Sequence, residues 1–402
     1  MMTTPKLEVA DIVREYGAEY TRTHRLPQRH LRTLHDIASC RTAVLGGHVD
    51  RCDGCGYERI SYNSCRNRHC PKCGSLAKEK WLRARTEELL PVPYFHIVFT
   101  LPDDLNGLTR INQRLMYTLL FQAAGETLLQ LGRDKKHLGA EVGMIAVLHT
   151  WGQNLMDHPH VHCIVPGGGL SEDGRRWIAS KESFFMPVRV LSRVFRGKFL
   201  EQLKRAYRER RLKCIGKETS LEYRENFQSL LDKLYSKEWV VYAKRPFGGP
   251  EQVLAYLGRY THRVAIANHR LVDMADGKVS FRWRDYRDHN REKIMTLEAS
   301  EFLRRFLLHI LPDGMCKIRY YGFMSNRKRK DRLDKCRRLL NAPMRAREPD
   351  SSTWQEMLLE LKGVDVLLCP SCHKGKMVGE RLLLPTGYSK YLFGVSTRYA
   401  PP

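Results

Sequence analysis

The stretch His158-Pro-His160-Val-His162-Cys-Ile-Val165 indicates more about this chain than any other segment. Its β-branched residues favour a strand in the middle of a sheet. Because alternate side chains of a strand point to the same face, His160 and His162 can bind one ion together. Two or three protein ligands leave positions on a divalent ion such as Mg²⁺ or Mn²⁺ open for a phosphate oxygen. The stretch therefore predicts a metal-binding strand.

A third ligand is expected from a neighbouring strand. Gln153 and His149 both precede the motif by the length of a hairpin, and we favour Gln153 while leaving His149 open. Pairs of histidines on a strand also occur as ordinary core or surface residues. The metal hypothesis therefore needs support from a second motif.

That support comes from Tyr256-Leu-Gly-Arg-Tyr260, which lies in a helix expected from about residue 251 to 260. Residues at i and i+4 share one face of a helix, so Tyr256 and Tyr260 can face one site, although aromatic residues at this spacing more often pack against a core. Lys244, Arg259 and Arg263 flank the pair and are expected to contact a DNA backbone.

Chemistry connects the two motifs. A phenolate that attacks a phosphodiester needs the charge of the scissile phosphate to be neutralised, and a bound metal ion does this. The product is a phosphotyrosine with a free 3′-hydroxyl, so the energy of the bond is retained. A second tyrosine allows a second cut while the first product is still attached, as strand exchange requires.

The surrounding pattern predicts an α+β fold in which a sheet is flanked by helices. Strand patterns occur at residues 94–102, 143–150 and 161–165, with a helical pattern between the first two. We predict a helical segment at 1–39, a zinc-binding domain at 40–80, a catalytic domain at 81–310 with a helical insertion at about 188–238, and a basic C-terminal region at 311–402.

Cysteines suggest further metal sites. Cys52-Asp-Gly-Cys55 and Cys70-Pro-Lys-Cys73 are spaced to close a tetrahedron around one structural Zn²⁺ ion. A second site is conceivable from Cys40, His48, Cys65 and His69. The pair Cys369 and Cys372 is half of a zinc site, and its candidate partners are Cys316, Cys336 and His373.

Composition points to a nucleic acid partner. The 402 residues carry 69 Lys and Arg against 44 Asp and Glu, a formal charge of +25, which suits a polyphosphate because basic residues displace its counterions. The first residues lack the pattern of a secretory signal, and no apolar run reaches the roughly 18 residues of a membrane span. We therefore expect no membrane association, a cytoplasmic location, and cysteines that bind metal rather than form disulfides.

These motifs resemble those of the rolling-circle insertion-sequence transposases of the two-tyrosine class, which carry a His-hydrophobic-His (HUH) motif and are relatives of the Helitron transposases. The resemblance covers nearly the whole chain and includes, in the family's order, Asn63-Ser-Cys-Arg-Asn-Arg-His-Cys-Pro-Lys-Cys73, Tyr94-Phe-His-Ile-Val-Phe-Thr-Leu-Pro102, His158-Pro-His-Val-His162 and Tyr256-Leu-Gly-Arg-Tyr-Thr-His-Arg263.

The resemblance implies a five-stranded antiparallel sheet, nicking of single-stranded DNA at the ends of an insertion sequence, metal binding by His160 and His162, and Tyr256 and Tyr260 as nucleophiles. Relatives differ in their third metal ligand, so Gln153 and His149 both stay open. The alternatives are a plasmid replication initiator or relaxase of the same chemistry, and a zinc-dependent DNA-binding regulator without catalysis. The oligomeric state and the target sequence are not predicted.

Overall fold

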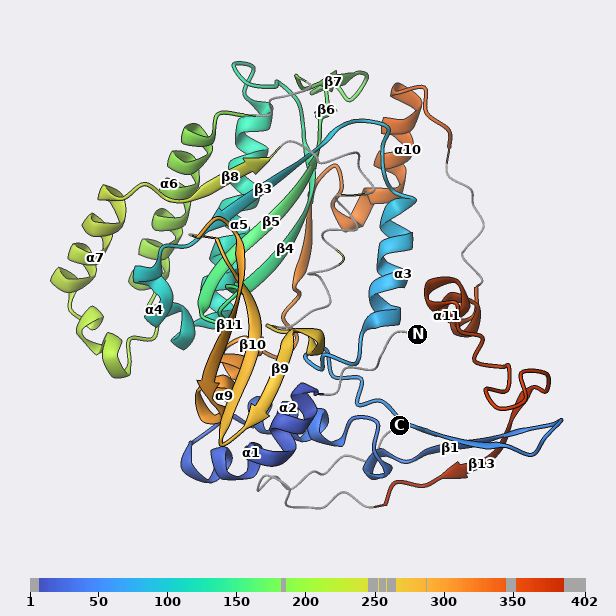
Figure 1. Cartoon of the computed structure of the whole chain (residues 1–402). Helices are drawn as coiled ribbons and strands as arrows, with labels where there is room; N and C mark the ends of the chain where they lie inside the picture. The colour runs from blue at the N-terminus through green and yellow to red at the C-terminus, as the bar shows by residue number, and fades with distance from the viewer. Residues whose placement is uncertain are drawn as a thin grey trace. The chain divides into compact units, whose positions relative to one another are not determined.

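The computed structural model describes residues 7–181, 186–244, 252, 258, 265–286, 288–344 and 352–386. The chain divides into two compact units, each assembled from separate stretches of sequence. Unit 1 contains residues 1–80, 262–310 and 347–402, and unit 2 contains residues 81–261 and 311–346. Helix α3 (Ser75–Thr86) carries the chain from unit 1 into unit 2 (Figure 1).

Unit 2 is built on a five-stranded antiparallel sheet with the strand order β12-β4-β5-β3-β8. The strands are β3 (Tyr94–Thr100), β4 (Gly143–Trp151), β5 (Asp157–Pro166), β8 (Val241–Lys244) and β12 (Ile318–Gly322). The motif strand β5 lies in the centre of the sheet, between β4 and β3. The expected sheet is therefore confirmed, and its edge strands come from distant parts of the sequence.

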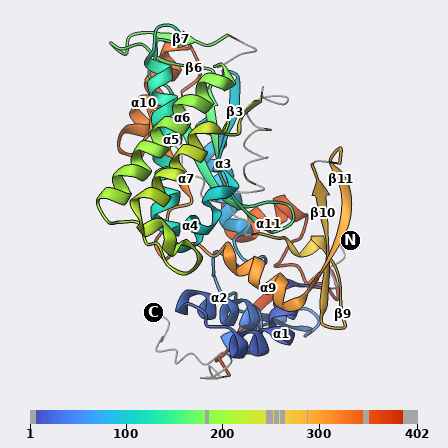
Figure 2. The ribbon, with the colours of Figure 1, turned by 90° about the vertical axis from the view of Figure 1, so that its left-hand side faces the viewer.

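One face of this sheet is covered by helices, and Figure 2 shows α5, α6 and α7 gathered on that side. Phe95, Ile97 and Phe99 alternate along β3 and enter the core beneath α5 and α6, where Phe195 and Phe199 meet them. The elements on this side are η2 (Asp103–Leu105), α4 (Asn106–Ile111), α5 (Gln113–Arg133), α6 (Val188–Arg208), η3 (Gly216–Glu222) and α7 (Arg224–Ser236). The helices expected at 188–238 are thus present.

The opposite face has a second, smaller core at one end. Tyr94, Ile145 and Ile164 pack there with Leu333 and Cys336 of α10 (Arg329–Leu339), which follows the short helix η5 (Asn326–Lys328). Farther along the same face the strands carry histidines instead of apolar residues. A small hairpin of β6 (Gly168–Leu170) and β7 (Trp177–Ala179) follows β5.

Unit 1 contains two three-stranded sheets, with the orders β13-β1-β2 and β11-β10-β9. Its helices α1 and α2 pack on each other, and α1 also packs on α9. The elements are α1 (Val9–Thr23), α2 (Gln28–Ser39), η1 (Ala43–Leu45), β1 (Gly47–Cys52), β2 (Glu58–Tyr62), η4 (Asn268–Arg270), β9 (Leu271–Ala275), β10 (Lys278–Asp285), β11 (Arg291–Glu298), α9 (Ala299–Leu308), α11 (Trp354–Lys362) and β13 (Met377–Leu383).

This division differs from the domain boundaries predicted from the sequence. Residues 262–310, expected in the catalytic domain, belong to unit 1. The region 311–402, expected to form a separate C-terminal part, is shared: β12 completes the large sheet of unit 2, and β13 pairs with β1 in unit 1. Antiparallel pairing between strands far apart in the sequence leaves no local signal in composition, which explains the difference.

Candidate functional site

Three histidines come together on the central strands of unit 2. His149 of β4 lies directly opposite His160 of β5, and His162 is two residues farther along the same strand. Ligand nitrogens of the three rings all lie within 4.8 Å of one another, and all three residues are buried. Strand alternation places His160 and His162 on one face, as predicted, and the pairing register adds His149.

Gln153 lies beyond the end of β4, in the turn that leads to β5. A register irregularity between His149 and Trp151 and the positive φ of Leu155 shape this hairpin. Of the two open candidates, the structure brings His149 to the histidine pair. His149 is therefore the third residue of the candidate metal centre.

Hydrogen bonds fix the orientation of two of these rings. Nδ1 of His160 lies 2.5 Å from the carbonyl oxygen of His158, so it donates a proton there and its Nε2 carries the lone pair. Nδ1 of His162 lies 2.7 Å from Nε2 of His96 on β3. Partners of this kind set the tautomer of histidines that bind metal. Sequence reasoning did not single out His96, although it stands inside the strand pattern at 94–102.

The surroundings of these histidines lower the pKa of their imidazoles and so favour the neutral form. Burial lowers the pKa of His160 to about 3, and burial with neighbouring imidazoles lowers the pKa of His149 and His162 well below 6.5. Burial, followed by the charge of Lys244, lowers the pKa of His96 to about 4. At neutral pH these imidazoles are unprotonated, which metal binding requires.

Two lysines supply positive charge next to the histidines. Lys244 of β8 pairs in register with His96. Lys317 stands just before β12; its ammonium lies 4.7 Å from the ring centre of Trp151, and its charge acts on His149 and His162. Lys244 was predicted to contact DNA, whereas Lys317 was missed because β12 is distant in sequence.

The predicted nucleophiles Tyr256 and Tyr260, and the predicted DNA-contacting Arg259 and Arg263, lie outside the described residues. Two residues of this segment are described, Gln252 and Gly258, and both are helical. Gly258 is buried beside Leu82 of α3, and a Cβ added to it would press on the end of the Leu82 side chain.

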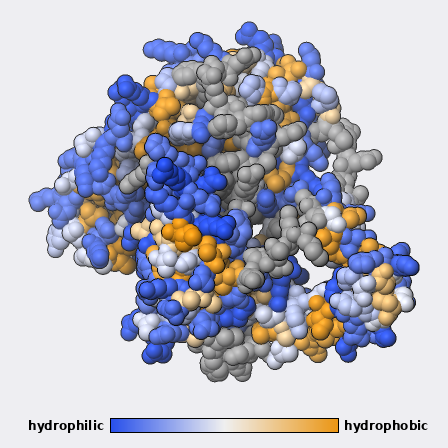
Figure 3. All heavy atoms as spheres, viewed as in Figure 1, coloured by the Kyte–Doolittle hydropathy of each residue, from blue (hydrophilic) through white to orange (hydrophobic). Residues whose placement is uncertain are grey.

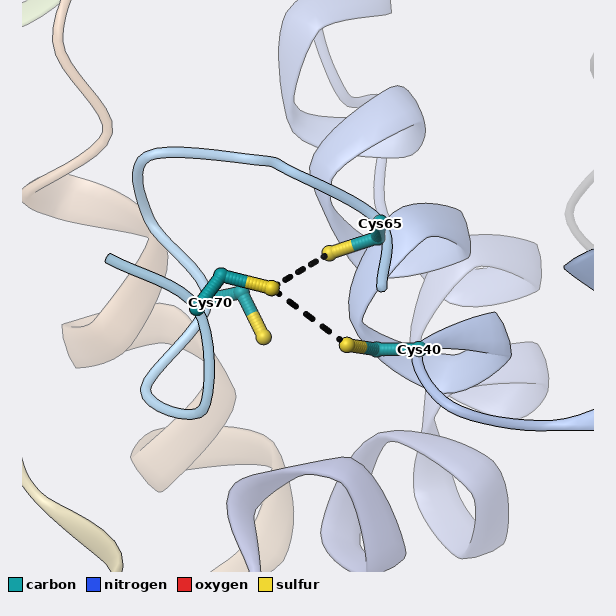
Figure 4. Close-up of side chains that lie close together, drawn as sticks. Cys40, Cys65 and Cys70 are labelled. Carbon is teal, nitrogen blue, oxygen red and sulfur yellow. Dashed lines mark hydrogen bonds between the residues drawn. The ribbon is translucent and has the colours of Figure 1, made fainter. Parts of the chain in front are cut away.

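The cysteines form two clusters of four. Cys40, Cys65, Cys70 and Cys73 make the first, and Figure 4 shows three of these thiols directed toward one another from the end of α2 and the loop after β2. Sulfurs of Cys40 and Cys65 lie 3.5 and 3.6 Å from that of Cys73. Cys52, Cys55, Cys369 and Cys372 make the second cluster.

The predicted grouping of Cys52, Cys55, Cys70 and Cys73 around one ion is therefore wrong in this structure, because the two Cys-x-x-Cys pairs belong to different clusters. A Cys-x-x-Cys turn has the same local geometry whichever partner it meets, so spacing does not reveal the pairing. Cys40 and Cys65, grouped with His48 and His69 as a second site, join the first cluster instead.

The remaining candidates lie elsewhere. His48 is 3.6 Å from a carboxylate oxygen of Asp50, and His69 is 3.2 Å from the side-chain oxygen of Asn67. Cys316 is exposed, and Cys336 is buried in the smaller core of unit 2. His373 lies next to Cys372 but is not a member of the second cluster.

Most described side chains on the face drawn in Figure 3 are hydrophilic. Among the described residues, no helix combines the length and the apolar character needed to span a bilayer.

Comparisons with known proteins agree on one kind of relative. Residues 143–332 match a family model described as "Putative transposase", and residues 12–101 match one described as "Transposase zinc-binding domain". The chain is 53% identical to "Putative transposase y4qJ" of Sinorhizobium fredii (strain NBRC 101917 / NGR234) over 92% of this chain and 94% of that protein. It is 28% identical to "Transposase for insertion sequence element IS801" of Pseudomonas savastanoi pv. phaseolicola, over 73% of this chain and 70% of that one.

Solved structures give weaker matches. Two structures of the conjugative relaxase TrwC in complex with oriT DNA align with TM-scores of 0.23 and 0.24 at 13% and 11% identity. They cover 41% and 60% of this chain, and 68% and 96% of their own.

Proposed function

Because the chain belongs to the IS91/IS801 family of transposases, and is thus a DNA strand-transfer enzyme, we propose that it nicks and transfers single-stranded DNA at the ends of an insertion sequence by rolling-circle transposition. The observation that carries the proposal is the convergence of His149, His160 and His162 on the central strands of unit 2. A buried set of three neutral imidazoles beside two lysines suits an ion that faces a phosphate.

His149, His160 and His162 would hold a divalent cation, Mg²⁺ or Mn²⁺. The fit rests on the donor set: nitrogens within 4.8 Å of one another, and rings that are unprotonated at neutral pH. When bound, such an ion acts as a Lewis acid that draws charge from a phosphate oxygen. His158 and His96 orient the ligating rings through their hydrogen bonds to His160 and His162.

Tyr256 and Tyr260 serve as the nucleophiles in this proposal. The phenol loses its proton, its oxygen attacks phosphorus, and the bond from phosphorus to the 3′ oxygen breaks. The products are a 5′-phosphotyrosine and a 3′ oxygen that takes up a proton as a free hydroxyl. Attack of a 3′-hydroxyl on the phosphotyrosine reverses the step and joins strands without an external energy source.

Lys244 and Lys317 contact the DNA backbone near the scissile phosphate, together with Arg259 and Arg263. What supports a role for the lysines is that the charge of Lys244 acts on His96 and that of Lys317 acts on His149 and His162. Basic side chains at such positions hold the register of the strand and carry no base specificity.

The zinc-binding domain holds its ion through Cys40, Cys65, Cys70 and Cys73, in this proposal. Four thiols close together satisfy the tetrahedral preference of Zn²⁺ and leave no open position, so the ion is structural. The domain would stabilise α1 and α2 and present unit 1 to the ends of the element. The protein acts in the cytoplasm, where thiols stay reduced.

The test is a covalent-adduct assay. Wild-type protein is incubated with Mn²⁺ or Mg²⁺ and labelled single-stranded DNA that carries the element's ends, and the products are separated on a denaturing gel. We expect a metal-dependent adduct that Tyr256→Phe and Tyr260→Phe together abolish. His160→Ala tests the metal, and Tyr223→Phe, an exposed tyrosine before α7, is the matched control.

The alternatives predict other outcomes. A DNA-binding regulator would shift the same DNA on a native gel without any adduct, and this result would overturn the proposal. A plasmid replication initiator or relaxase would form an adduct with a plasmid origin and none with the element's ends.

A further inference from the structure

Two Cys-x-x-Cys turns from opposite ends of the sequence meet in unit 1. Strand β1 ends at Cys52 and leads into the turn of Cys55, while Cys369 and Cys372 form a turn shortly before β13. β1 and β13 pair antiparallel, from Gly47 opposite Leu383 to Cys52 opposite Met377. This pairing brings cysteines 314 and 320 residues apart into contact.

The four sulfurs are spaced as ligands of one ion. The Sγ atoms of Cys52 and Cys372 lie 3.7 Å apart, and those of Cys55 and Cys369 also lie 3.7 Å apart. A tetrahedron with Zn–S bonds of about 2.3 Å has sulfur–sulfur edges of about 3.8 Å. A disulfide needs about 2.05 Å, and all four cysteines are free. The arrangement therefore matches a four-thiolate zinc site.

The backbone of both turns also donates hydrogen bonds to the sulfur atoms of their own cysteines. Backbone N–H groups of Gly54 and Cys55 donate to the sulfur of Cys52, each at 3.4 Å. The N–H of Ser371 donates to Cys369 at 3.4 Å, and that of Gly375 donates to Cys372 at 3.3 Å. Donors aimed at sulfur stabilise the charged form that binds metal.

The fit between the turns depends on a glycine. A Cβ on Gly375 would overlap the sulfur of Cys52 and press on Asp53. Asp53 joins the two turns further, since its N–H donates to the carbonyl of Lys376 at 3.1 Å and its carboxylate accepts from the N–H of Lys376 at 2.7 Å. The site is built by both segments together and does not exist in either alone.

We propose that Cys52, Cys55, Cys369 and Cys372 bind a second structural Zn²⁺ ion that links the C-terminal segment to the N-terminal zinc-binding domain. The family model for that domain ends at residue 101, so it contains no residue of the C-terminal pair. The ion would stabilise the pairing of β1 with β13, and the chain would carry two zinc ions rather than one. This inference is independent of the proposed DNA chemistry.

Zinc content of the full-length protein tests the inference. We expect two zinc ions per chain by elemental analysis, and one in the double variant Cys369→Ser with Cys372→Ser. The variant Cys40→Ser with Cys65→Ser should also fall to one, because it removes the other cluster. Cys316→Ser, which changes an exposed cysteine outside both clusters, should keep two.

A measurement on the wild type covers the case in which a variant fails to fold. In the zinc-loaded protein, alkylation mapped by mass spectrometry should spare Cys369 and Cys372 while Cys316 reacts, and a chelator should release both. Three results would each overturn the inference. Elemental analysis could find one zinc ion per wild-type chain, or two in the double variant of Cys369 and Cys372. Alternatively, Cys369 and Cys372 could be alkylated as fast as Cys316.

Discussion

At the scale of single residues, the candidate site depends on which side chains orient the ligands. His96 lies behind His162, with 2.7 Å between Nε2 and Nδ1 and nearly parallel rings. His96 contacts a residue of the candidate metal centre, so we assign it a positioning role. Sequence reasoning proposed His160 and His162 as ligands from their alternation, but the partner on the next strand depends on register.

Replacing His96 therefore has a defined effect on metal binding. We expect His96→Ala to weaken Mn²⁺ binding by about 10–100-fold, the usual cost of losing a partner of a ligating histidine. His96→Gln should recover part of the loss because its amide oxygen can accept from the Nδ1–H of His162. Calorimetric titration measures the affinity, and an unchanged Kd in His96→Ala would show that the contact has no positioning role.

The same titration can show whether His149 or Gln153 is the third metal ligand. Removing a ligand costs more than removing its partner, so His149→Ala should weaken Mn²⁺ binding by more than about 100-fold. Gln153→Ala should stay within about threefold of wild type, since the turn residue is not needed for the three-imidazole set. If Gln153→Ala proved the more damaging change, the assignment of the third ligand would be reversed.

At the scale of elements, sequence patterns predicted the strands and helices but not which strands pair. The strand β3 and the helices α6 and α7 all lie where periodicity placed them. The edge strand β12 and the pairing of β1 with β13 were missed, because the paired strands lie far apart in the sequence. The same reason explains the wrong grouping of the cysteines.

The junction of β12 with β4 offers a matched pair of glycines. Gly322 has φ +59°, and a Cβ there would overlap the carbonyl oxygen of Val142. Gly314 has φ +67° but open space around it. We expect Gly322→Ala to lower the free energy of unfolding by about 3 kcal/mol, against about 1 kcal/mol for Gly314→Ala. Equal losses in urea unfolding would contradict the steric account.

The helical segment that contains α7 is held by a charged cluster. Asp104 of η2 accepts from Lys233 at 2.7 Å and from Lys237 at 2.5 Å, and these bonds lower the pKa of Asp104 from 3.8 to about 2. A depressed carboxyl pKa stabilises the fold above 3.8, and the contribution disappears as pH falls through 2.

Asp104→Asn should therefore cost about 1 kcal/mol at pH 7, a value reduced by solvent screening because both lysines are about half exposed. The difference from wild type should shrink at pH 3. Urea unfolding at the two pH values measures it, with Glu209→Gln as a control for an exposed ion pair. If the stability difference between wild type and Asp104→Asn did not change with pH, the charge of Asp104 would not contribute to its bonds with the two lysines.

At the scale of the whole molecule, we expect the net positive charge to dominate the binding of DNA. The formal charge of +25 predicts that the affinity for single-stranded DNA falls steeply with salt. If about six phosphates are neutralised, binding should weaken by roughly 10²–10³-fold between 50 and 200 mM salt. Fluorescence anisotropy measures the slope.

Replacing a single lysine should change the slope of log affinity against log salt concentration by a defined amount. Lys244→Ala and Lys317→Ala should each lower its magnitude by about 0.7, the contribution of one phosphate contact on a single strand. Lys135 lies in the loop before the first residue of β4, whereas His149 is near the end of that strand. Lys135→Ala should therefore leave the salt dependence unchanged. If all three variants shifted the slope equally, the lysines would act only through net charge.

The pairing of β1 with β13 also sets the order in which the protein can mature on the ribosome. About 314 residues separate Cys55 from Cys369, and bacterial-type synthesis at about 5–20 residues per second needs roughly 15–60 s to cover them. Throughout that time one edge of β1 is without its final neighbour. A nascent chain thus cannot complete the sheet of β1, β2 and β13 until residue 383 has been translated, so products that stop before β13 lack a finished sheet.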